Sequence, residues 1–135
     1  MNLNEKIKLG DRAEISRSFT DKDVDAFATL SLDKNPIHLD HEYAMTTTFG
    51  KRIVHGMLVS SLFSALLANK LPGNGAIYLG QNLSFIAPCF LNEQVTASVE
   101  VIGVREDKPI YTLKTLCVNS KNELLIKGEA VVLFS

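Results

Sequence analysis

Tryptophan is absent from this chain of 135 residues, and only 7% of the residues are aromatic. So few rings do not suggest a surface on which nucleic-acid bases stack. The formal net charge is −1, so the chain also lacks the basic field that nucleic acids attract. No apolar run reaches the roughly 20 residues of a membrane-spanning helix. The composition therefore argues against nucleic-acid and membrane partners.

Cysteine is scarce as well. Cys89 and Cys117 are the two cysteines; they have no metal-binding spacing, and both lie in apolar surroundings. We interpret them as reduced, buried thiols of a cytoplasmic protein, since the first residues also lack the apolar region of a signal peptide. With 46% hydrophobic residues, the chain can build a sizeable core, and we expect a single domain over residues 1–135.

The most apolar stretch covers residues 55–71 and shows no strand-like alternation. Its apolar residues surround almost the whole helical wheel, which is typical of a helix enclosed by the rest of the fold. The Pro-Gly-Asn-Gly sequence at 72–75 ends it. We therefore predict a central core helix of about four turns.

Alternating segments predict strands over residues 12–19, 76–87, 94–104, 110–118 and 123–134. Short turns join the last four, so the sheet should be mainly antiparallel. One buried helix with long antiparallel strands indicates an α+β fold, in which the sheet curls around the helix. One helix would leave apolar strand edges exposed, so we expect a homodimer.

Before the core helix, residues 1–9 suggest a lead-in arm or strand, and a helix should begin after Thr20. Pro36 cannot continue that helix, so it should end near Leu32 and lead into a loop over residues 33–38. A short helical turn is expected over residues 40–45.

Asp33 and His38 lie in that loop, whose path Pro36 restricts. A carboxylate and an imidazole that point into one pocket can serve as a general acid–base pair. Alternatively, Asp33 caps a turn and His38 is a structural histidine. Asn35 braces the turn in either case.

Gly56 stands at the predicted start of the core helix. Its amide belongs to the first turn, where N–H groups have no partner within the helix, and glycine lets a substrate approach closely. The positive end of the helix dipole favours developing negative charge. The alternative is that Gly56 only permits tight packing.

Other polar groups offer weaker indications. His38, His41 and His55 lack a strong ligand spacing, so we predict no metal site. Lys51 and Arg52 could contact a phosphate or form a solvated pair. Ser64 in the core helix would ordinarily bond back to its own helix.

Two segments together resemble one enzyme family. Asp-Lys-Asn-Pro-Ile-His over residues 33–38 and Arg-Ile-Val-His-Gly-Met over residues 52–57 are similar to the (R)-specific enoyl-CoA hydratases, also called MaoC-like dehydratases. The segment over residues 78–88 is similar to the family's following strand. The resemblance implies the hot-dog fold, in which an antiparallel sheet wraps a long central helix, usually in a homodimer.

The resemblance also implies functional roles. Asp33 and His38 would hold the water that adds to a trans-2-enoyl thioester, and the Gly56 amide would bind the thioester carbonyl. Ser64 and Leu67 match helix positions near the site or the acyl chain, and Asn35 is a further substrate-binding candidate. The family commonly has Gly before the Asp, whereas this chain has Leu32, which would alter the loop and narrow the pocket if the position requires a positive φ.

We therefore predict reversible, (R)-specific hydration of trans-2-enoyl-CoA, with Asp33 as base and His38 as water holder and proton donor; the reverse assignment stays open. No cofactor or metal is required. The alternatives are dehydration of (3R)-hydroxyacyl groups on acyl carrier protein, a hot-dog thioesterase, and a non-catalytic subunit that binds acyl thioesters.

Overall fold

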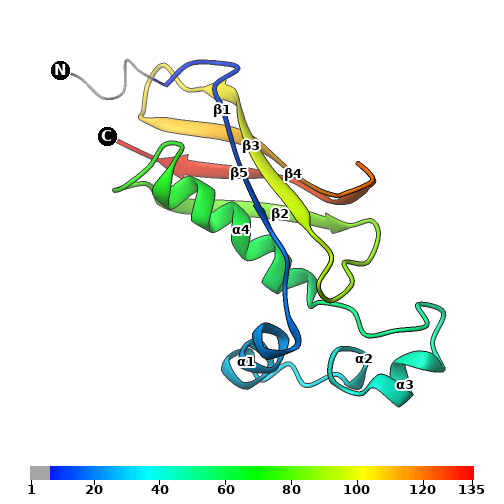
Figure 1. The fold of residues 1–135 in the computed structure, drawn as a ribbon. Coiled ribbons are helices and arrows are strands. Elements are labelled where there is room, and N and C mark those ends of the chain that lie inside the picture. Colours follow the sequence, from blue (N-terminus) through cyan, green and yellow to red (C-terminus); the bar gives the residue numbers. More distant parts are fainter. Residues whose placement is uncertain (1–6) are drawn as a thin grey trace.

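A five-stranded antiparallel sheet with a long helix along one face forms the body of the molecule, in a computed structural model that describes residues 7–135 (Figure 1). Part of the lead-in segment expected over residues 1–9 lies outside the described residues. None of the helices within residues 7–135 is both long enough and apolar enough to cross a membrane.

The strand order is β1-β3-β4-β5-β2, and all neighbours pair antiparallel. Alternation explains the strands: in β3, the side chains of Val95, Ala97, Val99 and Val101 are buried at every second position. The predicted α+β sheet is confirmed. Its strands are β1 (Arg12–Arg17), β2 (Ile77–Phe85), β3 (Val95–Val104), β4 (Ile110–Asn119) and β5 (Leu124–Leu133).

The core helix is α4 (Gly56–Asn69), which contacts β1, β2 and β3. Phe63 and Leu66 on its inner face are fully buried, whereas Met57 on its outer side is 59% exposed. Although α4 is apolar on nearly all sides, only part of its surface is therefore buried within one chain. Its first residue follows His55, which occupies the N-cap position.

Three shorter helices gather beyond the N-terminal end of α4 (Figure 1). Thr20 caps α1 (Asp21–Ser31) as predicted, in a reciprocal capping box with Asp23. Asp40 caps α3 (His41–Met45). The predicted loop over residues 33–38 is partly wrong, because Pro36 begins a short helix, α2 (Pro36–Leu39), at a position where proline needs no N–H partner.

Leu32 ends α1 in the left-handed conformation, with φ 69° and ψ 6°. Leucine pays a steric cost for this geometry, yet the chain needs the reversal to pass from α1 into the Asp33 loop. The side chain is 79% exposed and is not among the residues that line the cavity described below, so the expected narrowing of the pocket does not follow.

Replacing Leu32 with Gly should raise the free energy of unfolding by about 0.5–1 kcal/mol, because the relief of steric strain exceeds the entropy that glycine adds to the unfolded chain. Urea denaturation of both proteins measures this change. Leu30→Gly is the matched control: Leu30 is equally exposed but helical, so its replacement should lower stability by about 0.5–1 kcal/mol. A loss of stability in Leu32→Gly would contradict the strain argument.

Candidate active site

A cavity of about 330 Å³ opens between the loop that carries Asp33, the start of α4 and the segment after β2. Its volume lies in the range of small-molecule sites. Its polar members are Asp33, His38, His55 and Gly56. The remaining wall is apolar, formed by Phe49, Ile53, Val54, Met57, Val59, Phe85, Ile86, Ala87, Pro88, Cys89, Leu125 and Ile126.

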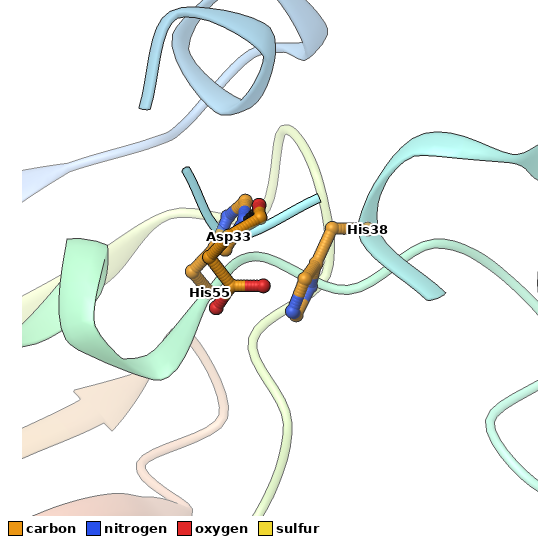
Figure 2. A group of neighbouring side chains, drawn as sticks. All are labelled: Asp33, His38 and His55. Atoms are coloured by element: carbon orange, nitrogen blue, oxygen red, sulfur yellow. Dashed lines mark hydrogen bonds between the residues drawn. The ribbon is translucent and has the colours of Figure 1, made fainter. Parts of the chain in front are cut away.

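Three ionisable side chains meet at this cavity (Figure 2). One side-chain nitrogen or oxygen atom of each of Asp33, His38 and His55 lies within 4.8 Å of the others. Asp33 is exposed, whereas His38 is only 9% exposed and His55 only 1%. The structure thus brings together the predicted pair, and it adds a histidine for which the sequence analysis gave no role at the site.

Local chain geometry sets the position of the pair. The Asn35 side chain accepts a hydrogen bond from the Ile37 amide at 3.2 Å and so caps α2, as its bracing role required. The Asn35 amide in turn donates to the Asp33 carboxylate at 3.3 Å. His38 directly follows Ile37 on α2. Its ring points toward Ile53, in the chain that leads into α4.

Hydrogen bonding determines the tautomer of His38. Its Nδ1 lies 2.8 Å from the carbonyl oxygen of Ile53, and because a carbonyl can only accept, Nδ1 carries the proton. Nε2 therefore has a free lone pair whenever the ring is neutral. Burial lowers the pKa of His38 below 6.5, and the Ile53 hydrogen bond offsets this only in part. The positive charge of nearby Arg52 lowers that pKa further, while Asp33 raises it.

Residues 52–55 form a backing segment for the loop that carries the pair. Arg52 Nε donates to the carbonyl of His38 at 2.7 Å, and the Ile53 amide donates to Ile37 at 3.3 Å. His55 Nε2 lies 2.9 Å from the carbonyl oxygen of Asp33. The backing segment is itself bonded to the chain that follows β2, since the Val54 amide donates to the carbonyl of Cys89 at 2.8 Å.

The contacts of Arg52 fit neither role considered from the sequence, which were a phosphate ligand and a solvated cation. Its guanidinium holds the His38 carbonyl and lies 3.6 Å from Asp25 of α1. Lys51 stays exposed, with its ammonium 4.4 Å from the centre of the Phe90 ring. No linear pattern indicated the contacts of Arg52 and His55, because their partners lie 14 and 22 residues away.

Gly56 begins α4 and lines the cavity. A Cβ atom at this position would lie 2.5 Å from the ring of Phe85, so any other residue would require this half-exposed ring to move. Its amide also belongs to the first turn, whose N–H groups lack partners within the helix. The close approach of the Phe85 ring therefore supports the packing role of Gly56, and carbonyl binding by its amide stays a prediction.

Two further site candidates, Ser64 and Leu67, are not among the residues that line the cavity. Ser64 is exposed on the outer side of α4, and Leu67 is buried in the core on the inner side. A role for either in binding an acyl chain stays a prediction.

A shared metal ion fits the three ionisable side chains poorly. His38 and His55 each direct one ring nitrogen to a backbone carbonyl, which leaves one nitrogen on each ring. The two rings stack with their centroids 3.8 Å apart and their planes at 26°. Lone pairs lie in the ring planes, so those of two stacked rings run side by side instead of converging on one cation. The acid–base role of Asp33 and His38 stays a prediction.

Comparison with known proteins places the chain in a family. A model described as "MaoC like domain" matches residues 4–122. The (R)-specific enoyl-CoA hydratase of Aeromonas caviae is 52% identical over 95% of this chain and 96% of the relative. The enzyme of the same name from Rhodospirillum rubrum is 43% identical over 96% of this chain and 89% of the relative.

A solved structure supports the same family membership. The (R)-hydratase of A. caviae superposes with a TM-score of 0.95 and 51% identity, covering 97% of this chain and 99% of that one. The sheet and helix described above therefore form the hot-dog fold. By sequence and by structure, the chain belongs to the MaoC-like family that includes the (R)-specific enoyl-CoA hydratases.

Proposed function

We propose that this protein is an (R)-specific enoyl-CoA hydratase, which reversibly adds water to trans-2-enoyl-CoA and yields (3R)-hydroxyacyl-CoA. The observation that carries the proposal is the meeting of Asp33 and His38 at one apolar cavity. The high identity to hydratases over nearly the whole chain supports the same reaction.

The tautomer of His38 suggests the order of proton transfers. The neutral ring accepts a proton from the bound water at Nε2, while the Asp33 carboxylate holds the second hydrogen of the water. The water oxygen bonds to C3, and the electron pair of the double bond moves onto the thioester as an enolate. Protonated His38 then delivers its proton to C2. One water is consumed, and the hydroxyl and the new hydrogen arrive on the same face.

This order of proton transfers differs from the roles predicted from the sequence, since His38 accepts a proton before it donates one. The lowered pKa of His38 favours that order, because the ring is neutral when substrate binds. Asp33 would orient the water and stabilise the positive charge that forms on His38. The chemistry calls for no cofactor or metal.

The enolate needs a hydrogen-bond donor at the thioester oxygen. The amide of Gly56 is suited to that task because it opens α4 at the cavity, where the helix dipole favours negative charge. A donor of this type typically contributes about 3 kcal/mol to the transition state.

Dehydration of (3R)-hydroxyacyl groups on acyl carrier protein is the second candidate. The mitochondrial 3-hydroxyacyl-[acyl-carrier-protein] dehydratase of Arabidopsis thaliana is 39% identical over 94% of this chain, and the same residues would run the reaction in reverse. A thioesterase would not need this acid–base loop, and a non-catalytic subunit would not need to keep both members of the pair.

We also propose a homodimer formed along β2. This strand lies at the edge of the sheet, and Ile77, Leu79 and Phe85 on it are each at least half exposed. An exposed apolar edge strand is a ready pairing surface. For the location, the free, buried cysteines favour the reducing cytoplasm.

Asp33→Asn and His38→Ala should each lower kcat by about 10²–10⁴-fold, the span expected for positioned acid–base groups. The assay follows the loss of the enoyl-thioester ultraviolet band with crotonyl-CoA, and chiral analysis identifies the product. His41→Ala is the matched control, because His41 is exposed on α3. Purified wild-type protein that leaves crotonyl- and octenoyl-CoA untouched would refute the hydratase proposal.

The pH dependence of kcat/KM should show the state of His38. Acid protonates Nε2 and removes the lone pair that accepts the proton of water, so the rate falls as pH decreases. Because burial lowers the pKa of His38, the midpoint of this fall should lie below 6.5, the ordinary pKa of histidine. A profile measured from pH 5 to 8 tests this; a midpoint for His38 above 6.5 would contradict it.

Sedimentation equilibrium should give about twice the 14.9 kDa chain mass. Leu79→Lys on β2 should shift the protein toward monomer by placing charge on the apolar edge. Ile102→Lys on β3, which is similarly exposed but not on an edge strand, should leave the mass unchanged. A monomeric wild-type protein would exclude the dimer.

A further inference from the structure

His55 is a buried ionisable group that the mechanism above leaves unused. Its side chain is 1% exposed and lies against His38, with the ring centroids 3.8 Å apart. Phe27 of α1 meets the His55 ring edge-on at 4.8 Å. The His55 ring is therefore clamped between α1 and the reactive ring of His38.

The hydrogen bonding of His55 defines one tautomer. Its Nε2 lies 2.9 Å from the carbonyl oxygen of Asp33 and must donate to it. Its Nδ1 is buried and has no hydrogen-bond partner among the described residues. A proton on Nδ1 would have no acceptor there, so the arrangement fits a ring with hydrogen on Nε2 alone.

The backbone at Asp33 is held in place partly by a contact from outside its own segment. It follows the left-handed Leu32 and precedes α2, in a stretch without helix or strand hydrogen bonds. Its amide donates to the exposed Ser31 hydroxyl at 3.1 Å, and its carbonyl is held from the buried side by His55. The Asn35 amide holds the carboxylate itself, and His55 holds the backbone from which that side chain extends.

We propose that His55 is a positioning residue that sets both members of the acid–base pair: its Nε2–H fixes the Asp33 backbone and its ring face fixes the plane of His38. This inference rests on the proposed hydratase function. It assigns His55 no proton transfer with substrate. A displacement of about 1 Å in either catalytic group can cost on the order of 10²-fold in rate, so one side chain that orders both has a large effect.

Two variants separate the two contacts. His55→Gln keeps an N–H donor at the distance of Nε2 but removes the ring face, and His55→Phe keeps the ring face but removes the donor. Each should lower kcat by about 10-fold, and His55→Leu, which removes both, by about 10²-fold. KM should change less than about threefold, because the substrate contacts remain.

Histidine NMR tests the arrangement without any assay of activity. The chain has three histidines, so single replacements assign each ring. Long-range proton–nitrogen correlations in the resting protein should show His55 protonated at Nε2 and bare at Nδ1, and His38 protonated at Nδ1. His55→Phe should speed amide hydrogen exchange over residues 33–38. These readouts stand even if the wild-type protein proves inactive on enoyl thioesters, an outcome that would refute the proposed function alone.

Three results would overturn the positioning role. Wild-type kcat in His55→Leu would show that the pair is ordered without it. A loss in His55→Gln as large as in His38→Ala would make His55 a catalytic group. A His55 ring protonated at Nδ1 would remove the bond to Asp33. Val101→Ala, a core change in β3, controls for stability: it should lower the melting temperature and leave kcat unchanged.

Discussion

The site depends on hydrogen bonds between two short segments that carry little regular structure. Arg52, Ile53 and His55 contact the loop and helical turn from Asp33 to His38 through backbone carbonyls and amides. The connection between β2 and β3 and the first turn of α4 hold the backing segment, and the backing segment holds the loop. The predicted acid–base pair can therefore lie on an exposed connection and still be positioned by the rest of the fold.

The sequence reveals the elements of this fold well because each has a strong local pattern. The alternation in β3, the apolar surface of α4 and the capping residue Thr20 each indicate their structure without knowledge of the rest of the chain. The short helix α2 has no such pattern, since four residues give no periodicity and proline more often signals a break.

The candidate site was predictable only in part, for a related reason. Asp33 and His38 lie five residues apart on a chain stiffened by Pro36, so their proximity follows from local geometry. The contacts of Arg52 and His55 join residues 14 and 22 positions apart, and only the tertiary fold determines them. The left-handed geometry of Leu32 was indicated only by the family's usual Gly at this position, because leucine itself argues against it and the chain path imposes it.

Burial of the two cysteines makes selective labelling of an added surface cysteine possible. Both are buried, and burial raises the pKa of each thiol to about 12, so neither presents a reactive thiolate near neutral pH. A single cysteine introduced on the surface would thus be the one thiol that an alkylating dye modifies. Leu32 offers such a place, since its side chain is exposed and it directly precedes Asp33 at the edge of the cavity.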